Sequence, residues 1–224
     1  IGSEAYIKQH NESNETLKGR ASKEYYDQFF IIDKAGKIII DNNKAFLGID
    51  VNNRDYVKGA FQGRTTISEP IISKSVGKYV VAIAAPIKDT NGEVIGAMGS
   101  SIFLDYFGSK VSNIKIGEKG YAFIFDATGH MIYHQDNKLL GKHVKELNTP
   151  QLEDIVNAVN NSVDNEVKTT EYKWNGEDKI TSASPVAQTK WVVLTSAAKE
   201  EALKDVNTMM KTILGITFLI LVVA

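Results

Sequence analysis

The chain has 224 residues, which is enough for one large domain or two small ones. Hydrophobic residues make up 43% and charged residues 24%, as in ordinary folded proteins, and the net charge of −1 argues against a nucleic-acid partner because no basic excess exists to neutralise phosphates. The absence of cysteine excludes disulfides, thiolate chemistry and zinc sites built on cysteine.

The first predicted element is a stalk helix over residues 1–28. Residues 1–24 are polar and compatible with a helix, and they carry no signal-peptide pattern. We therefore expect a helix whose upstream part is missing from this sequence.

Residues 29–108 form the first predicted module, in which apolar runs alternate with turn signals. Asn91-Gly92 predicts a tight hairpin, because both residues tolerate the positive φ of a primed turn. Pro86 ends the strand before that hairpin, because proline cannot donate a hydrogen bond to a neighbouring strand. The predicted elements are a strand–turn–strand unit at 30–51, a short helix at 57–61, and strands at 65–67, 71–72, 79–85 and 94–99.

Small residues at 96, 97 and 99–101 leave room over this predicted sheet. Arg54 and Tyr56, which precede it in the sequence, would cap that room, and a capped space over a sheet is how a small-ligand pocket is built. The alternative is a core filled by side chains, with Arg54 paired to Asp55 or Glu69, since most pairs of arginine and acid are structural. Both interpretations stay open at this point.

The sequence repeats itself. Residues 30–51 align with residues 123–144 without a gap, at a constant offset of 93. Turn residues coincide as well as apolar ones, for example Asp33 with Asp126, so a chance similarity of composition is a poor explanation. Two related α+β modules in tandem follow from this repeat, the second over residues 109–198.

The second module lacks the features of a binder. Where the first module has Arg54, the second has a helix-like stretch over 150–162 without arginine. Large aromatic residues are able to fill its small core unaided: Tyr121, Phe123, Phe125, Tyr172, Trp174 and Trp191. We therefore predict that the first module binds a ligand and that the second is a spacer.

Catalytic and metal-binding chemistry has little support. The sequence contains no nucleophile elbow, no phosphate-binding glycine loop and no metal-ligand motif with a known spacing. His130, His134 and His143 fall in the second module, where 130 and 134 share one face of a strand, so a zinc or pH-sensing site is conceivable. Surface histidines need no such explanation, and we assign no metal, no cofactor and no catalytic residue.

The end of the chain predicts a membrane anchor. A charged, amphipathic segment over 198–211 leads into a run without charge from Thr212 to Ala224. As a helix, the 13 residues of this run span about 20 Å, short of the roughly 30 Å hydrocarbon thickness, but the sequence stops within the run. We expect a helix over 199–224 that enters a transmembrane span, with a buried core helix as the alternative.

Three stretches of the first module carry a resemblance to a known family: RDYVKGAFQG from Arg54, SEPIISKSVGKYVVAIAAPI from Ser68 and GEVIGAMGSSIFLDYF from Gly92. They resemble the membrane-distal module of the double Cache sensor domains of bacterial methyl-accepting chemotaxis receptors and, less often, of sensor histidine kinases or diguanylate cyclases. With the stalk helix and the second module, the resemblance covers nearly the whole chain. It implies an extracytoplasmic sensor in a membrane-bound homodimer, with the ligand in the distal module and a signal passed by helix displacement to a cytoplasmic output domain.

Carried over position by position, the resemblance implies a binding site that departs from that of the amino-acid-binding members. Arg54 matches the arginine that holds the ligand carboxylate, and Tyr56 keeps one of the two aromatic residues that follow it. Ser101 stands where those members place an aspartate against the ligand's ammonium, and burying an ammonium without an anion costs free energy. Three further positions also differ from those members: Val57 stands in place of an aromatic residue, Ile71 in place of a tyrosine and Ser73 in place of an aspartate.

The ligand implied is therefore a small carboxylate or a similarly compact polar molecule, with an amino acid as the alternative. The implied contacts are Arg54 as a bidentate anion clamp, Tyr56 and Tyr79 as walls, and Ser68, Ser73 and Ser101 as hydrogen-bond donors. Two other function classes remain open on the sequence. A membrane-tethered enzyme requires acid, base or nucleophile groups that we do not find, and a structural ectodomain requires a first module whose pocket is filled by side chains.

Overall fold

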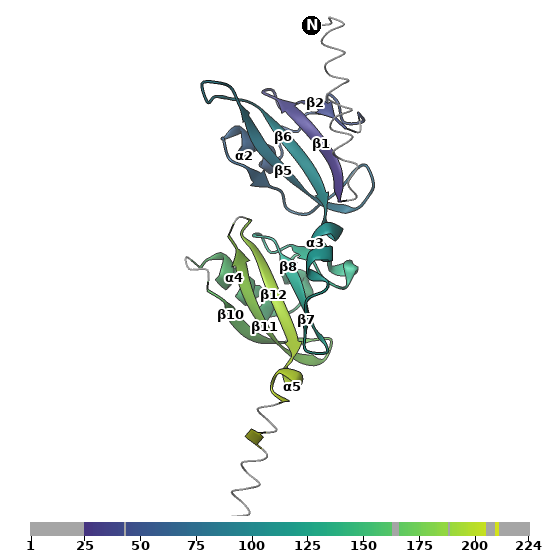
Figure 1. Ribbon diagram of the computed structural model, residues 1–224, viewed down its shortest axis with the longest axis vertical. Coiled ribbons are helices and arrows are strands. Elements are labelled where there is room, and N and C mark those ends of the chain that lie inside the picture. The colour runs from purple at the N-terminus through teal and green to yellow at the C-terminus, as the bar shows by residue number, and fades with distance from the viewer. Residues whose placement is uncertain (1–24, 43, 163–165, 188, 205–208, 211–224) are drawn as a thin grey trace, which may run out of the picture. The chain divides into compact units, whose positions relative to one another are not determined.

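The computed structural model describes residues 25–42, 44–162, 166–187, 189–204 and 209–210. The chain divides into two units, Ile1–Ser109 and Lys110–Ala224, close to the boundary between the two predicted modules. Each unit contains one six-stranded antiparallel sheet with a helix packed against it (Figure 1). The predicted α+β fold with two antiparallel-sheet modules is therefore confirmed.

The sheet of the first unit has the strand order β2-β1-β6-β5-β3, and β4 also pairs with β5. The first strand begins at Tyr26 and pairs with β6 from there on, so residues 26–28, which we expected in the stalk helix, lie in the sheet. Residues 1–24 of that expected helix are outside the described residues. The strands are β1 (Tyr26–Asp33), β2 (Ile38–Asp41), β3 (Thr66–Ile67), β4 (Ile71–Ile72), β5 (Tyr79–Lys88) and β6 (Val94–Phe103).

Helix α2 (Asp55–Phe61) covers one face of this sheet (Figure 1). It buries Val57 and Ala60 in a core that includes Phe30. A Cβ added to Gly59 would lie 2.3 Å from Cγ2 of Thr66, so a glycine at this position lets the helix approach β3. The core of the first unit consists of Phe30, Ile32, Ile38, Val51, Tyr56, Val57, Ala60, Ala82, Ala84 and Ala97.

The strand β5 runs through Pro86, contrary to our expectation that it ends there. On the side away from β6, the neighbours of β5 pair with it no further than Ala84, so Pro86 has only Ala97 of β6 as a partner. Proline is tolerated at such a position because its missing N–H would face no strand. Pro185 of the second unit has the same place, beyond Ala183, where the pairing with strand β10 ends.

Matching hydrogen bonds confirm the repeat at an offset of 93 residues. Asp33 Oδ1 and Asp126 Oδ1 each accept the backbone N–H groups of the residues two and four positions later. Gly36 and Gly129 follow with φ angles of +84° and +93°, which favour glycine. The carbonyl of each glycine accepts a hydrogen bond of 2.8 Å from the valine at the end of its repeat, Val51 or Val144.

The hairpin at Asn91-Gly92 forms, but not as the two-residue primed turn that we expected. Gly92 has a φ of +85°, whereas Asn91 is not in the left-handed region. Asp89 Oδ1 instead accepts the N–H groups of Asn91 and Glu93 at 2.9 Å each, as in the two repeated turns. A carboxylate that satisfies two backbone donors stabilises this longer Asp-x-x-Gly turn.

The sheet of the second unit has the order β10-β11-β12-β8-β7, with β9 paired to β8. Helix α4 (Pro150–Asn160) packs on β10 and β11 through residues spaced three and four apart, among them Leu152, Ile155 and Val159. The other elements are α3 (Leu104–Val111), β7 (Lys115–Ile116), β8 (Gly120–Phe125), β9 (Met131–Tyr133), η1 (Asn137–Leu139), η2 (Val144–Leu147), β10 (Lys168–Trp174), β11 (Glu177–Val186), β12 (Trp191–Ala198) and α5 (Lys199–Ala202).

Aromatic side chains fill the second unit, as expected. Phe123, Phe125 and Tyr172 belong to its buried core, and Tyr121 and Trp174 pack against that core. The Tyr172 hydroxyl is 2.8 Å from the Ser196 hydroxyl, so its polar end is satisfied inside the unit. Trp191 is also buried, outside this cluster.

The structure describes only the beginning of the predicted C-terminal helix. Helix α5 begins at Lys199, where we expected the C-terminal helix to begin. Within the described residues, no helix has both the length and the apolar character needed to cross a membrane. The run from Thr212 to Ala224 lies outside the described residues.

Candidate ligand-binding site

A cavity of about 120 Å³ lies in the first unit. A single water needs at least about 10–15 Å³ of such space, so the cavity suits a compact ligand. Its polar and charged lining residues are Asp27, Gln28, Arg54, Ser73, Lys74 and Ser101. Its apolar lining residues are Phe30, Ile38, Phe46, Ile49, Val51, Tyr56, Ile71, Ile72 and Val80. An apolar wall that carries a few polar groups is the usual composition of a small-molecule site.

The cavity brings together four of the six residues that the sequence analysis selected. Arg54, Tyr56, Ser73 and Ser101 line it, although they come from the start of α2, the loop after β4 and strand β6. Ser68 and Tyr79 do not appear among the described residues of the wall. The part that each residue plays in binding stays a prediction.

Arg54 is the N-cap residue of α2, and its backbone N–H donates to Val51 O at 3.0 Å. Its side chain is solvent-exposed at the cavity wall. One acid that the sequence offered as its partner, Asp55, is bound by Lys58 Nζ at 2.9 Å instead. Within the described ranges Arg54 has no ion-pair partner, so its guanidinium keeps its full hydrogen-bonding capacity.

Tyr56 is the aromatic residue that the helix turns toward the cavity, and only 9% of it is exposed. Burial raises the pKa of its hydroxyl above the ordinary value of 10, and the positive charge of Arg54 opposes this rise. The hydroxyl is therefore protonated at neutral pH and can donate a hydrogen bond.

Ser73 and Ser75 hold a carboxylate at the cavity wall. The Ser73 hydroxyl donates to Asp27 Oδ2 at 2.7 Å, and the Ser75 hydroxyl donates to Asp27 Oδ1 at 2.6 Å. Ser73 is itself buried, with 6% exposed. The serine that we expected to donate to a ligand therefore binds an aspartate that lines the same cavity.

Asp27 is the residue of this site that the sequence analysis missed. Neighbouring residues of a regular strand point to opposite faces of the sheet, yet Asp27 and Gln28 both line the cavity. The pairing of β1 with β6 shifts register between Tyr26 and Gln28, and such a bulge re-aims a side chain. The polar pair Asp27-Gln28 before Phe29 and Phe30 is the only trace of this arrangement in the sequence.

The two remaining predicted residues have structural contacts. The Ser68 hydroxyl accepts the N–H of Ala82 at 2.8 Å and donates to Glu69 O at 2.6 Å, which extends the pairing beside β3. Tyr79 pairs with Ile72 where β4 meets β5. Both residues thus take part in holding the strands around the cavity.

The small residues of β6 do not all leave empty space. A Cβ on Gly99 would lie 2.3 Å from Cε2 of Phe30, so the room above this glycine is filled by the phenylalanine ring. The cavity is lined two residues further along the strand, at Ser101, which pairs with Gln28. The first unit thus combines the two interpretations that the sequence left open, a filled core and a pocket beside it.

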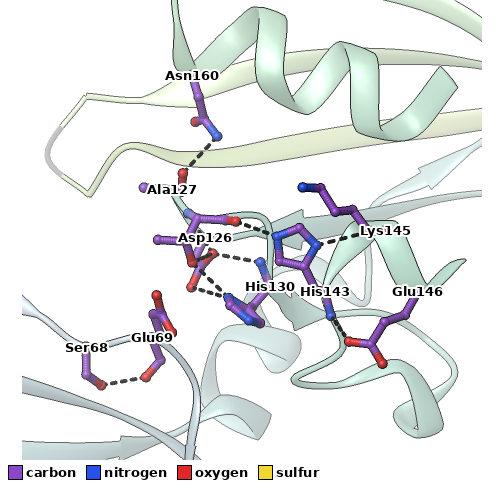
Figure 2. A network of polar contacts seen from close by, with 10 residues as sticks. Ser68, Glu69, Asp126, Ala127, His130, His143, Lys145, Glu146 and Asn160 are labelled. Carbon is purple, nitrogen blue, oxygen red and sulfur yellow. Dashed lines mark hydrogen bonds and ion pairs between the residues drawn. The ribbon is translucent and has the colours of Figure 1, made fainter. Parts of the chain in front are cut away.

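In the second unit, His130 and His143 come together at the repeated turn (Figure 2). Their ring centroids are 5.0 Å apart, and His130 Nδ1 is 2.8 Å from Thr128 Oγ1 and 3.7 Å from Asp126 Oδ2. His143 Nε2 is 2.9 Å from the Thr128 carbonyl, which can only accept, so this nitrogen carries the proton. Among the described residues there is no group of three acidic or histidine side chains that could hold a metal ion.

His134 lies apart from these two histidines. It is 4% exposed and packs among the rings of Tyr121, Phe123 and Trp174. Its Nδ1 accepts the N–H of Asp136 at 2.9 Å. Burial lowers the pKa of His134, an effect that the nearby Asp136 opposes.

Two related sheet units in tandem, with a cavity in the first, have a counterpart among known families. Residues 3–206 match the family dCache_1, described as a Cache domain. The chain belongs to the Cache domain family. The resemblance seen in the first module is thereby confirmed for most of the chain.

Several curated relatives of this Cache domain are methyl-accepting chemotaxis proteins. McpA of Pseudomonas putida is 29% identical over 160 residues, which cover 69% of this chain and 23% of that protein. PctB of Pseudomonas aeruginosa is 26% identical over 168 residues, covering 72% of this chain and 24% of PctB. PscA of Pseudomonas syringae pv. tomato is 36% identical over 91 residues, which cover 39% of this chain and 14% of PscA. The chain therefore spans less than a quarter of the length of these relatives.

Solved structures share the fold of this Cache domain. The ligand-binding domain of the Pseudomonas fluorescens chemoreceptor CtaA, in complex with L-isoleucine, gives a TM-score of 0.64 at 23% identity over 85% of this chain and 78% of CtaA. PctB of Pseudomonas aeruginosa in complex with L-Arg gives 0.62 at 21% identity, covering 88% of each chain. The extracellular domain of mmHK1S-Z3, from a protein assigned to the histidine kinases, gives a TM-score of 0.72 at 17% identity. The match covers 89% of this chain and 83% of the mmHK1S-Z3 domain.

Proposed function

We propose that this Cache domain is the extracytoplasmic sensor region of a transmembrane chemoreceptor. In this proposal the cavity of the first unit binds a small carboxylate or a similarly compact polar molecule, without turnover. The observation that carries it is the position of Arg54, a cation at the wall of an otherwise mostly apolar cavity, without an ion-pair partner in the described part of the chain. Such a group has its electrostatic complement in an anionic ligand.

The chemistry of the wall suits a carboxylate. A guanidinium presents parallel N–H donors that match the two oxygens of a carboxylate, which a lysine ammonium does not. Tyr56 supplies a protonated hydroxyl and an aromatic surface, and Ser101, 5% exposed, supplies a further hydroxyl on β6. The apolar remainder of the wall excludes water and strengthens these contacts.

The curated relatives described above favour a chemoreceptor, since they are chemotaxis proteins. The sensor of a histidine kinase or of a diguanylate cyclase is the alternative for the output, because the mmHK1S-Z3 domain has the same fold. An amino-acid ligand is the alternative for the input, because CtaA and PctB were solved with amino acids. Anchoring in a membrane and assembly as a homodimer belong to the same proposal.

Signalling follows if the liganded first unit favours one position of a connecting helix over another. Shifts of about 1–2 Å are typical of such transitions. The bias that the ligand imposes cannot exceed the difference between its affinities for the two states. A ligand that binds both states equally well would therefore occupy the cavity without a signal.

The test begins with thermal melting of the protein against a library of organic acids, amines and nucleobases, followed by calorimetry of any compound that raises the melting temperature. Arg54→Ala should weaken binding of a carboxylate by roughly 10- to 100-fold, the worth of a charge-assisted pair. Arg54→Lys should recover only part of the affinity. Arg64→Ala is the matched control, because Arg64 is exposed, donates to Gln62 Oε1 at 2.6 Å and is not among the lining residues.

Equal affinities of the wild type and Arg54→Ala, with Arg64→Ala also unchanged, would mean that Arg54 is structural. Chemical conversion of the bound compound would point to the enzyme class instead. Absence of stabilisation by any compound of the library would favour a structural ectodomain.

A further inference from the structure

Helix α5 follows strand β12 directly and lies at one end of the sheet of the second unit (Figure 1). None of the residues of α5 is buried, so its position is not fixed by an apolar core. Two polar contacts hold it instead, and they reach opposite edges of the sheet. The strand order β10-β11-β12-β8-β7 places β10 at one edge and β7 at the other.

The first of these, which we call the β7 contact, is made by the carboxylate of Glu201. Its Oε1 accepts the backbone N–H of Glu118, and its Oε2 accepts that of Lys119 at 3.3 Å. Both donors belong to the turn between β7 and β8, where Gly117 has a φ of +63°. Successive N–H groups that point to one side of a turn form a concavity that binds an anion. A Cβ on Gly117 would collide with the carboxylate of Glu201, so the glycine lets this side chain reach the two donors.

The second, the β10 contact, is an ion pair between Lys199 Nζ and Glu171 Oε2 at 2.5 Å. Lys199 is the first residue of α5, and Glu171 lies in the middle of β10. The two side chains are 37% and 56% exposed, and exposed ion pairs stabilise a structure only slightly because water and salt screen them. The β7 contact is exposed as well. Neither contact is therefore strong enough to hold the helix against a modest opposing change.

Room for a displacement of α5 lies beside the helix. A cavity there has a volume of about 390 Å³, whereas a single water needs only about 10–15 Å³. A helix without buried residues next to such a cavity can shift without disrupting a packed core. The cavity is lined by Lys199, Glu200 and Leu203 on the side of the helix and by Lys119, Glu177 and Asp178 on the side of the sheet.

We propose that α5 is a movable helix whose position across the end of the sheet is set by the balance of the β7 contact and the β10 contact. Because the two contacts pull toward opposite edges, weakening one lets the other draw the helix to its own edge. A change that favours one contact over the other by a small free energy is then enough to move α5. Both contacts and the cavity lie in the second unit, so this switch does not depend on the ligand proposed for the first.

The test is a distance measurement by pulsed electron paramagnetic resonance between spin labels at Ala158→Cys and Ala202→Cys. Both alanines are exposed, one on α4 and the other on α5, and the chain has no cysteine of its own. In this labelled parent, Glu201→Ala removes the β7 contact and Lys199→Met removes the β10 contact. We expect the two variants to change the distance between the labels in opposite directions, each by at least about 1–2 Å.

Two further variants are matched controls that should leave this distance unchanged. Glu200→Ala removes an acid from the same helix without removing either contact, and Lys119→Met keeps the backbone N–H that Glu201 binds. Hydrogen exchange of the N–H groups of Glu118 and Lys119, followed by NMR, is a second measurement. In Glu201→Ala it should be about 10-fold faster than in the parent, with the exchange of N–H groups within β8 unchanged.

Unchanged distances in both Glu201→Ala and Lys199→Met would overturn the proposal and assign the position of α5 to its connection with β12. A shift of both variants in the same direction, or an equal shift in Glu200→Ala, would also overturn it, because the two contacts would then not oppose each other. Unchanged hydrogen exchange at Glu118 and Lys119 in Glu201→Ala would remove the β7 contact and the proposal with it.

Discussion

The hydroxyl of Ser73 donates a hydrogen bond to Asp27 Oδ2 at 2.7 Å and so joins residues that are 46 positions apart. The bond connects the loop after β4 to β1, with β5 and β6 lying between these two strands in the sheet. Both residues line the cavity with Arg54. This tertiary contact therefore contributes to the position of the negative charge at the candidate site.

Gly99 and Ser100 are neighbours on β6 with opposite expected responses to alanine. In Gly99→Ala the new Cβ would lie 2.3 Å from the ring of Phe30, which is 3% exposed and has little room to move. We expect this variant to lose about 1–3 kcal/mol of unfolding free energy, as in other overpacked cores.

Ser100→Ala is the matched control, because the Ser100 hydroxyl is buried without a hydrogen-bond partner among the described residues. Removing an unsatisfied hydroxyl should leave stability unchanged or raise it. Urea unfolding followed by circular dichroism measures both variants. A Gly99→Ala protein as stable as the wild type would show that the core beside the cavity is not tightly packed.

The repeated turns provide a second matched pair, Asp33→Ala and Asp126→Ala. Asp126 is 3% exposed, and its Oδ1 accepts the N–H groups of Thr128 and His130 and the Thr128 hydroxyl. Removing this acceptor leaves sheltered donors unsatisfied, so Asp126→Ala should cost about 1–3 kcal/mol of unfolding free energy.

Asp33→Ala should cost less, because the donors of its turn are exposed and water can replace the carboxylate. Both tryptophans of the chain, Trp174 and Trp191, lie in the second unit, so tryptophan fluorescence follows the unfolding of the unit that contains Asp126, and circular dichroism, to which both sheets contribute, follows that of the unit with Asp33. An equal or larger loss in Asp33→Ala would contradict this account of the repeat.

His134 should make the second unit less stable in mild acid. Burial lowers its pKa in the folded state below the ordinary value of 6.5, so the unfolded chain binds a proton more readily. The stability contributed by the neutral imidazole is fully present above about pH 6.5 and is lost as the pH falls below it, by at most about 1.4 kcal/mol per pH unit.

The test substitution is His134→Asn. It removes the titrating imidazole, and the amide oxygen of the new side chain can still accept the N–H of Asp136. Urea unfolding followed by tryptophan fluorescence at pH 7.5 and pH 5.5 should show a smaller loss of stability in the variant than in the wild type. The same pH dependence in both proteins would assign the effect to other groups.

Much of the fold could be predicted because its signals are local. An aspartate that satisfies N–H groups two and four residues later, followed by a glycine with positive φ, determines its own turn, and this is why the repeat at an offset of 93 is visible in the sequence. Arg54 and Tyr56 were selected for a different reason, their match to the binding motif of the resembling family, and both lie at the start of the short helix α2.

Other predictions failed or remained incomplete because they depend on which strands become neighbours. Pro86 can stay within β5 only because the pairing on its N–H side ends at Ala84. Gly99 offers no space for a ligand because Phe30 pairs opposite it and covers it. No property of either residue type reveals these neighbours.

By itself, the sequence determined the two tandem modules, their turns and the arginine that heads the first one, since short-range backbone hydrogen bonding and the apolar pattern are written in consecutive residues. Only the tertiary structure decided where the negative charge of the site comes from. Asp27 reaches the cavity through a bulge in the pairing of β1 with β6, and Ser73 and Ser75 hold it there across the sheet. A register shift and a contact between distant residues result from the packing of the whole unit, so no stretch of consecutive residues encodes them.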